Sequence, residues 1–415
     1  MTSRARDLDV VVYGATGFVG RLVAEYLAEH APAGTRIGLA GRSVEKLERV
    51  RAGLGPAAVG WPLLRADATD DASLDNLAAA THVVASTVGP YARYGLPLVR
   101  ACAEAGTDYV DLTGEVLFVR ESIDRYHDVA ASTGARIVHS CGFDSVPSDL
   151  GVHALHRQVR ADDAGDLTET TLVVTSVRGG LSGGTIDSLR MQIDAVTHDA
   201  GLRKLALSPY SLSPDPVSEP ALGRQSDAAV VRGSDITPGM PGWKAPFFMG
   251  PYNTRVVRRS NALTGYGYGR LFRYREVMNV GSSPLSALLA GGTAAGMGAA
   301  VAGLAFPPTR WLLDRVLPKP GEGPSEKSRR SGHFTIDVHT ATTSGARYCC
   351  RVAAQGDPGY AATAVMLGES ALSLALQHDA LPDSPGGVLT PATGLGDVLV
   401  DRLRDAGFEI AVRRM

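Results

Sequence analysis

The stretch Asp-Val-Val-Val-Tyr-Gly-Ala-Thr-Gly-Phe-Val-Gly, from Asp9 to Gly20, decides the fold of this chain. Its β-branched run at positions 10–12 is typical of a central parallel strand that is buried on both faces. The run stops before Gly14, and glycine adopts positive φ without a steric penalty, so a tight turn follows the strand. From Phe18 onward, apolar residues recur at helical spacing, which predicts a helix directly after the turn.

A strand, a glycine turn and a helix N-terminus in this order are typical of a pyrophosphate-binding site. Glycines in the turn let the backbone approach the anion, and Gly20 lets the helix lie close to the strand. The alternative is a turn without a ligand, because the G-x-x-G-x-x-G spacing differs from the common G-x-G-x-x-G pattern. We predict that a dinucleotide binds along Gly14, Ala15, Thr16, Gly17, Phe18 and Val19.

The end of the second predicted strand, at residues 36–40, indicates which dinucleotide binds. Sites for NAD usually place an acidic residue there to accept a hydrogen bond from the ribose 2′-hydroxyl. This chain has Gly-Arg-Ser at positions 41–43 instead. Arg42 can form paired hydrogen bonds to a 2′-phosphate, and Ser43 and Lys46 can add to them. The sequence therefore favours NADP(H), with a solvated surface arginine as the alternative.

Strands and helices alternate as far as residue 140, which predicts a six-stranded parallel sheet. We therefore expect an α/β fold of the Rossmann type, doubly wound, over residues 1–148. The third strand leads to Asp67 and Ala68, which could flank the adenine, although Asp67 could equally cap the next helix. The fourth strand breaks into the loop Val88, Gly89 and Pro90, which we place beside the cofactor at the carboxyl edge of the sheet.

Residues 149–387 show a different pattern and predict a second, α+β domain. A strand at residues 169–178 and a hairpin at residues 334–353 would form its sheet. The glycine-rich turn at residues 179–185 opens a helix and either binds an anion or is only a capped turn. Residues 208–243 are rich in Pro, Ser and Gly, so we expect an extended loop. The arginines that follow it would line the entry of an acidic ligand or form a solvated basic face: Arg255, Arg258, Arg259, Arg270, Arg273 and Arg275.

An apolar segment at residues 277–317 lies within this second domain. It has no charged residue before Arg310 and contains many Ala, Gly and Leu residues. Its length would allow a membrane span, and Gly292 and Gly296 form a G-x-x-x-G pair. Its prolines and glycines lower its hydrophobicity, so we favour a buried or interface helix pair over membrane-surface contact, and surface contact over a span.

Composition excludes several classes of function. The net charge is -2, with 44% hydrophobic and 20% charged residues, so neither disorder nor nucleic-acid binding is favoured. The four cysteines are too few and too irregularly spaced for a disulfide framework or a zinc site. Asp7 and Asp9 interrupt any export signal. We expect a cytoplasmic enzyme without a metal and leave membrane association open.

Three sequence blocks together resemble the saccharopine dehydrogenase-like oxidoreductase family, and within it the trans-acting enoyl reductases of lipid and polyketide biosynthesis. The blocks are G-A-T-G-F-V-G from Gly14, V-G-P-Y-A-R-Y-G-L-P-L-V-R-A-C-A-E-A-G-T-D-Y-V-D-L-T-G-E from Val88, and H-S-C-G-F-D-S-V-P-S-D-L-G from His139. Looser similarity continues at residues 245–249, 320–324 and 387–396. The resemblance implies that the second domain binds substrate and dimerises, and that the helix within residues 388–415 packs back on the nucleotide-binding domain.

The resemblance also implies a reaction, the NADPH-dependent reduction of a C=C bond in an acyl or polyketide thioester, with the substrate free or bound to a carrier. Amino-acid oxidoreduction of the saccharopine type and a non-catalytic NADP-binding scaffold are the alternatives. Reduction of an enoyl thioester leaves an enolate that needs a proton. Tyr91 and Tyr94 are the leading proton donors, with packing against the nicotinamide as the alternative for either.

Several other polar residues lie near the predicted crevice. Asp144 is the third catalytic candidate, beside Asp111 and Glu115, although Asp144 and Asp149 could instead cap helices and Glu115 could bind backbone amides. Cys141 is interpreted as a buried structural thiol, because no base is placed beside it. His153 and His156 have no metal-binding frame.

Overall fold

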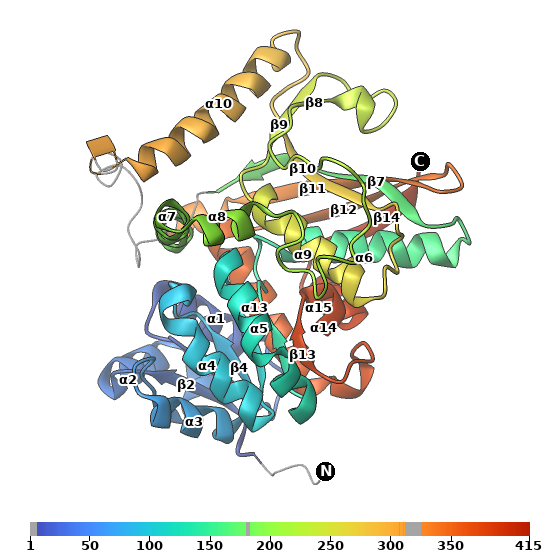
Figure 1. Ribbon diagram of the computed structural model, residues 1–415. Coiled ribbons are helices and arrows are strands. Elements are labelled where there is room, and N and C mark those ends of the chain that lie inside the picture. The colour runs from blue at the N-terminus through green and yellow to red at the C-terminus, as the bar shows by residue number, and fades with distance from the viewer. Residues whose placement is uncertain (1–5, 180–182, 307, 310, 312–324) are drawn as a thin grey trace.

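The computed structural model describes residues 6–179, 183–306, 308–309, 311 and 325–415. Its two lobes are each built on a seven-stranded sheet. In Figure 1 the N-terminal lobe lies below the second lobe, and the chain crosses between them more than once. The arrangement is an α/β nucleotide-binding lobe with a second α+β lobe, as predicted.

The lower sheet is parallel throughout, with strand order β13-β6-β5-β4-β1-β2-β3. The valines at positions 10–12 are fully buried because β1 lies in the middle of this sheet, between β4 and β2. The strands are β1 Leu8–Tyr13, β2 Ile37–Gly41, β3 Leu63–Arg65, β4 Thr81–Ser86, β5 Asp108–Asp111, β6 Arg136–Val138 and β13 Gly387–Leu389.

Helices cover both faces of this sheet. On one face α3, α4 and α5 pack side by side, and on the other α1 packs against α13. The helices are α1 Phe18–His30, α2 Val44–Gly53, α3 Asp71–Ala80, α4 Tyr91–Ala105, α5 Val116–Thr133 and α13 Thr363–Leu376. The predicted six strands are wrong, since β13 adds a seventh strand. Helix α13 also packs on this sheet, although it comes from the segment assigned to the other domain.

The upper sheet has strand order β14-β12-β11-β7-β10-β9-β8. All its pairs are antiparallel except β7 with β10. Helix α6 packs on β11 and β12, and α9 packs on β10. The elements are α6 Val146–Ala161, β7 Leu167–Arg178, β8 Val231–Arg232, β9 Trp243–Pro246, α9 Gly250–Leu263, β10 Arg273–Asn279, β11 His333–Thr342, β12 Arg347–Gln355 and β14 Glu409–Arg414.

The C-terminal segment joins both lobes. After β13 it forms α14 (Pro391–Gly394) and α15 (Gly396–Asp405), and α15 packs on α13 and α6. It ends in β14, which pairs with β12 at the edge of the upper sheet. The predicted C-terminal helix, α15, thus contacts α13 of the nucleotide-binding lobe and also α6 of the other lobe, whereas β14 completes the upper sheet.

The arginines of α9 do not line an entry and do not form a solvated face. Arg255, Arg258 and Arg259 are at most 4% exposed. Arg258 Nη1 donates to Pro209 O at 3.2 Å, and Arg259 Nη1 donates to Leu212 O at 2.6 Å. These side chains fix the start of the predicted extended loop on α9, so both alternatives stated for them are wrong.

Three helices lie near the side of the molecule where the lobes meet. Helix α7 (Gly183–His198) and helix α8 (Ala200–Leu207) follow β7, and α12 (Glu326–Arg330) precedes β11. The predicted glycine-rich turn lies partly outside the described residues.

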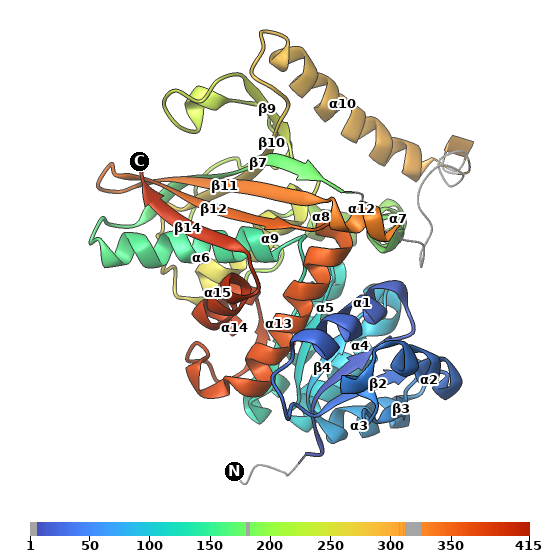
Figure 2. The same ribbon diagram turned by 180° about the vertical axis from the view of Figure 1, so that it is seen from behind.

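Helix α10 (Ser286–Ala305) stands away from the body in Figure 1 and Figure 2. It is largely exposed, so the buried alternative of the favoured helix pair is wrong for α10, whereas an interface helix stays a prediction.

Candidate active site

The turn between β1 and α1 has the close packing that a dinucleotide site requires. Gly14 has a φ of 87°, and a Cβ atom on it would lie 2.7 Å from Val88 Cγ2. A Cβ atom on Gly20 would lie 2.8 Å from the Gly14 carbonyl carbon. The turn is also hydrogen-bonded to the loop after β4, because Thr87 Oγ1 donates to Tyr13 O at 3.1 Å. Side chains at the two glycines would therefore separate the turn from the helix and from the loop.

The N-terminus of α1 offers free backbone donors at this turn. Gly17 is the residue before the helix, and no side chain caps it. Gly17 N donates to Gly14 O at 2.9 Å, which tightens the turn. The first N–H groups of a helix have no helical acceptor, and the helix dipole places partial positive charge there. Residues 14–19 thus form the kind of cradle that binds a pyrophosphate.

Basic side chains lie where the adenosine ribose would follow. Arg42 is exposed directly after β2. Ser43 Oγ accepts a hydrogen bond from Lys46 N at 3.3 Å and so caps α2, while its own proton can still be donated. A pocket of about 410 Å³ beside them is lined by Thr16, Arg21, Glu25, Lys46, Arg49, Val50, Gly53 and Leu54. Arg49 was not predicted, although it follows Lys46 by one helical turn. This cationic surface fits a 2′-phosphate.

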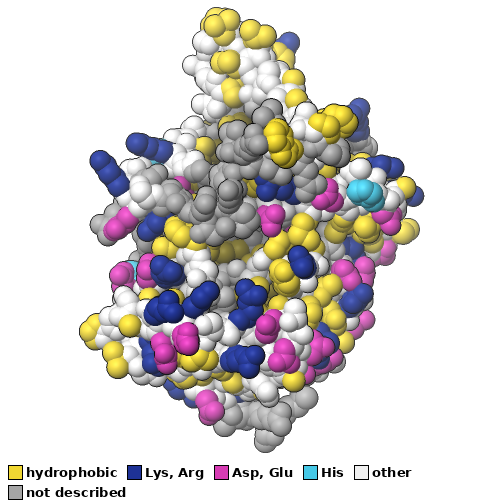
Figure 3. All heavy atoms as spheres, turned by 90° about the vertical axis from the view of Figure 1, so that its left-hand side faces the viewer, with side chains coloured by type: hydrophobic (Ala, Val, Ile, Leu, Met, Phe, Trp, Pro, Cys, Tyr) yellow, Lys and Arg dark blue, Asp and Glu magenta, His cyan; other side chains and the backbone are white. Residues whose placement is uncertain are grey.

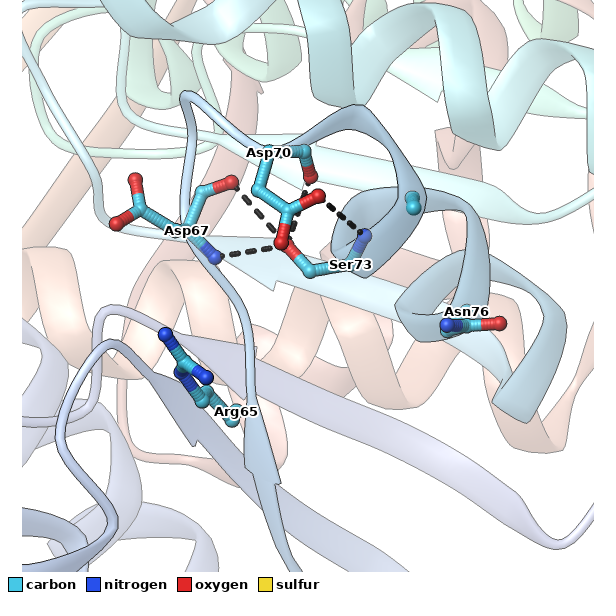
Figure 4. A pocket seen from close by; sticks show the side chains of 6 residues that line it. Arg65, Asp67, Asp70, Ser73 and Asn76 are labelled. Atoms are coloured by element: carbon cyan, nitrogen blue, oxygen red, sulfur yellow. Dashed lines mark hydrogen bonds between the residues drawn. The ribbon is translucent and has the colours of Figure 1, made fainter.

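Asp67 lies after β3, in a second pocket of about 240 Å³ (Figure 4). Its Oδ1 accepts hydrogen bonds from Thr69 N at 3.0 Å and Thr69 Oγ1 at 2.9 Å, which lower the pKa of the carboxyl. The cap of α3 is Asp70, which accepts from Ser73 N at 3.3 Å. The alternative that Asp67 caps this helix is therefore wrong. Asp67 and the neighbouring Ala68 are partly exposed at the carboxyl edge, where an adenine would lie.

Tyr91 has a structural role. Its ring is buried against Phe118, and its hydroxyl donates to Ser86 O at 3.1 Å and accepts from Leu112 N at 3.2 Å. Burial raises the pKa of this hydroxyl well above its ordinary value. Both hydrogen-bonding functions of the hydroxyl are thus used inside the protein. The hydroxyl thus joins the end of β4 to the loop after β5. These contacts disfavour the predicted role of Tyr91 as proton donor, which stays a prediction.

Glu115 links the nucleotide-binding lobe to α7. Its carboxylate accepts hydrogen bonds from Tyr91 N at 2.9 Å and Ala92 N at 2.7 Å, at the start of α4. It also accepts from Ser188 Oγ on α7 at 2.6 Å. Burial raises the pKa of the carboxyl despite these donors. The predicted alternative of backbone-amide binding describes Glu115, and the contact with Ser188 also links it to α7.

Asp111 holds the end of β5 to the end of β6. It is fully buried and hydrogen-bonds to His139 Nδ1 at 2.7 Å. It also accepts from Tyr109 Oη at 3.0 Å and from Ser140 N at 2.9 Å. Ser140 has a φ of 66°, which is uncommon for a residue with a side chain and is found most often at functional sites. Asp111 therefore positions the backbone that turns Ser140 toward the other lobe.

Tyr252, from the start of α9 in the other lobe, meets Ser140 in the buried contact between the lobes. The two hydroxyls form a short hydrogen bond, and either oxygen can be the donor. Burial raises the pKa of Tyr252 well above its ordinary value, so the phenol is neutral. We did not predict Ser140 or Tyr252 from the sequence. The sequence offered one indication of them, their position: Ser140 lies in the family-like block from His139, and Tyr252 follows the similar segment at residues 245–249.

Two predicted catalytic residues keep unused polar groups. Asp144 is partly exposed, and its carboxylate has no hydrogen-bond partner among the described residues. Burial raises its pKa to about 6. Tyr94 is half-buried, with the Arg93 guanidinium 5.1 Å from the centre of its ring, and its hydroxyl also has no partner in the described part of the chain. These two side chains remain available to a ligand.

The other polar candidates have structural partners. Asp149 accepts from Ala392 N at 2.7 Å at the start of α14, so it caps a helix as the alternative stated. Burial raises the pKa of the Cys141 thiol. His153 Nε2 hydrogen-bonds to Asp397 at 2.9 Å. No group of three His, Cys, Asp or Glu residues within the described ranges could hold a metal ion.

Comparisons with known proteins agree with this geometry. The family described as "Saccharopine dehydrogenase NADP binding domain" matches residues 10–138. A relative from Mycobacterium tuberculosis strain H37Rv, provisionally named a trans-acting enoyl reductase, is 53% identical over 100% of both chains. A protein of Mycobacterium ulcerans named "Trans-acting enoyl reductase" is 48% identical, again over 100% of both chains.

A solved structure shares the whole fold. Saccharopine dehydrogenase (L-Glu forming) from Saccharomyces cerevisiae aligns with a TM-score of 0.53 and 14% identity, covering 98% of this chain and 99% of that chain. At this identity the likeness concerns the fold alone. The cofactor is NADP(H), which fits the glycine turn and the basic residues after β2. The chain is an NADP-dependent oxidoreductase that belongs to the family of the trans-acting enoyl reductases, with a nucleotide-binding domain of the saccharopine dehydrogenase type.

Proposed function

We propose that this protein reduces the C=C bond of an α,β-unsaturated acyl or polyketide thioester with NADPH, in lipid biosynthesis. The observation that carries the proposal is the similarity to proteins named trans-acting enoyl reductase, at 48–53% identity over the whole chain. The site supports it, because a partly buried acid without a partner lies at the edge where a hydride acceptor would be placed.

The nucleotide-binding lobe holds and orients the cofactor. The glycine turn and the α1 N-terminus bind the pyrophosphate, and Arg42, Ser43 and Lys46 bind the 2′-phosphate. Residues Val88, Gly89 and Pro90 border the reactive end, since they follow β4 beside the turn. When bound, NADPH supplies the hydride. Glu115 hydrogen-bonds to the start of α4 and to α7 and so holds the two helices together at this edge.

The remaining residues complete the reduction. Hydride addition at the β-carbon of the thioester leaves an enolate, whose charge lies partly on the thioester oxygen. The hydroxyls of Ser140 and Tyr252 can donate hydrogen bonds to that oxygen after their mutual hydrogen bond opens. Asp144 then donates a proton to the α-carbon and is reprotonated by solvent. Its pKa of about 6 is suited to an acid near neutral pH. Tyr94 is the second candidate donor.

Several finer points belong to the same proposal. The relatives are named trans-acting, and this word favours a substrate presented by a separate carrier. A cytoplasmic location, where NADPH is available, accords with the proposal. The homodimer stays a prediction.

The test is NADPH oxidation with short α,β-unsaturated acyl thioesters, followed by identification of the saturated product by mass spectrometry. We expect turnover with the enoyl thioester and none with its saturated analogue. Saccharopine with NADP, measured in parallel, tests the amino-acid alternative. Turnover of saccharopine alone would reject the proposal. Tight NADPH binding without turnover of carrier-bound or free enoyl thioesters would favour a scaffold.

A further inference from the structure

Helix α10 is the most exposed apolar element of the molecule. By length and composition, two helical stretches of the described residues could cross a membrane. The stretch Pro358–Leu376 is a core helix, with 72% of its apolar window buried, whereas only 11% of the α10 window is buried. Leu285, Leu288 and Leu289 are 64%, 74% and 51% exposed. A helix that is apolar all round and exposed needs a partner that the monomer does not provide.

The inner face of α10 rests on the protein, which fixes the orientation of the helix. Ser286 Oγ accepts a hydrogen bond from Trp243 N at 3.0 Å, and Ala290 and Leu304 are buried. The helix packs on β9 and on α7. Its exposed leucines therefore point away from the body, and in Figure 3 the uppermost part of the molecule is mostly hydrophobic or uncharged.

The packing of α10 along the protein disfavours a membrane span. Ser286 near the start of the helix and Leu304 near its end are both buried, and the helix packs on β9 and on α7. A span would need lipid on all sides of the helix over about 30 Å. We therefore expect the partner of α10 to cover its outer face only.

A second copy of α10 would cover too little surface to hold a dimer alone. A 20-residue helix is about 30 Å long and about 10 Å wide, so it offers roughly 300 Å² to a partner helix. Two such faces bury about 600 Å² in total, against the roughly 1,200 Å² of a stable interface. Helix α10 has no charged side chain, and the hydroxyl of Thr293 donates to Leu289 O of the helix itself, so little on α10 would specify a protein partner.

The flanking residues match an anionic lipid surface. Phe306 and Trp311, which follow α10, are 59% and 60% exposed, and tryptophan is enriched at the level of lipid headgroups. In the sequence that follows α10, residues 310–319 contain three Lys or Arg residues and one Asp residue. Excess positive charge close in sequence to an apolar helix favours attraction to anionic headgroups. An interfacial helix usually has its own polar face. In this protein, the inner face of α10 is covered by the protein body, which serves as the polar side of the helix.

We propose that α10 inserts its outer face into the surface of an anionic bilayer and attaches the enzyme peripherally to the membrane. The helix lies parallel to the surface, with Leu288 and Leu289 in the acyl region. The attachment rests on α10 alone and would hold whatever substrate the active site reduces.

The test is sedimentation of the full chain with vesicles of phosphatidylglycerol and phosphatidylcholine at physiological salt. We expect binding to the anionic vesicles that weakens as the salt concentration rises. The double variant Leu288→Glu/Leu289→Glu should lower the vesicle-bound fraction at least tenfold. The matched control is Val217→Glu/Leu271→Glu, which adds the same charge at apolar residues 94% and 59% exposed elsewhere, and it should bind as the wild type does.

Two further measurements distinguish a lipid bilayer from a second copy of the chain as the partner of α10. Trp311 fluorescence should shift to the blue with anionic vesicles, and Trp311→Phe should remove that shift. Sedimentation equilibrium over a range of protein concentrations gives the oligomeric state of the wild type and of the leucine variant. No binding to anionic vesicles, or equal binding by both double variants, would overturn the proposal. So would a dimer that the leucine variant dissociates in the absence of vesicle binding.

Discussion

Gly20 packs directly on Gly14, because the first turn of α1 lies over the turn that ends β1. A Cβ atom on Gly20 would lie 2.8 Å from the Gly14 carbonyl carbon and 2.8 Å from Thr87 Oγ1. Real Cβ contacts of this length do not occur in folded proteins, and two of the opposing groups belong to backbone or to a hydrogen-bonded side chain. The approach of helix to turn therefore depends on glycine at position 20.

Gly20→Ala should move α1 away from the turn and weaken the cofactor site. Overpacking of this kind costs about 1–3 kcal/mol or more, so we expect a lower free energy of unfolding and a clear loss of NADPH affinity. Chemical denaturation and fluorescence titration with NADPH measure the two effects. Gly291→Ala is the control, because Gly291 is helical, lies on α10 in the other lobe and has nothing within 4 Å of an added Cβ atom. It should be neutral or slightly stabilising. Equal behaviour of the two variants would contradict the packing argument.

Arg42→Ala should shift the preference between the two nicotinamide cofactors. Hydrogen bonds to a charged group contribute about 1.5–3 kcal/mol, so NADPH affinity should fall about 10- to 100-fold while NADH affinity changes little. Adding Lys46→Ala should lower NADPH affinity further. Arg51→Ala removes the same charge from α2, but Arg51 Nη1 donates to Trp61 O at 3.0 Å, so this control should keep the preference. An unchanged ratio of NADPH to NADH affinity in Arg42→Ala would reject the assignment.

Tyr91→Phe separates structure from chemistry at the crevice. Loss of the hydroxyl leaves Leu112 N and Ser86 O without their partner, which should lower the free energy of unfolding by about 1–3 kcal/mol. Turnover at a temperature where the variant is folded should stay within a few-fold of wild type. Tyr94→Phe is the matched variant, because the Tyr94 hydroxyl has no partner among the described residues and its loss should cost little stability. A kcat that collapses in Tyr91→Phe with unchanged stability would restore Tyr91 as the donor.

Local patterns predicted the nucleotide-binding half of the fold well. The β1 strand, the glycine turn and α1 form where expected because each depends on residues within a few positions of one another. The strand β13 has only three residues and pairs with β6, about 250 positions earlier, so no local pattern marks it. Helix α13 carries a long apolar stretch but nothing in its sequence says which sheet it covers.

The candidate site could likewise be predicted only in part from the sequence. The turn and the basic residues after β2 follow from spacing, whereas the fate of a polar side chain depends on distant partners. Arg259 illustrates the limit: it is 1% exposed because its two Nη atoms donate to Leu212 O and Val388 O, from two separate segments. Its sequence neighbours, Arg255 and Arg258, gave the pattern of a basic surface. The pairing of Ser140 with Tyr252 could not be predicted for the same reason.

Asp144→Asn should remove the proton donor while leaving the cofactor site intact. General acids contribute about 100- to 10,000-fold, so we expect kcat to fall by about 100-fold or more, with unchanged NADPH affinity. Asp144→Glu should keep part of the activity. Asp67→Asn is a control carboxylate at the other end of the cofactor, which should affect NADPH affinity rather than kcat. If Asp144→Asn lowered only the affinity for NADPH, the carboxyl would have a binding role instead.

The pH dependence distinguishes an acid at position 144 from a structural carboxyl. Burial raises the folded-state pKa from 3.8 to about 6, so the protonated form required for donation is lost above that pH and kcat should fall as pH rises. In Asp144→Asn, kcat should no longer fall with rising pH in this range.

The effect on stability has a definite sign. A raised carboxyl pKa gives stability that is present below the ordinary pKa and is lost as pH rises through about 6. The amide removes that loss, so Asp144→Asn should be more stable than wild type near neutral pH, by about 1–2 kcal/mol after allowing for partial exposure. A variant that is both inactive and less stable at neutral pH would mean that the carboxylate has a structural partner.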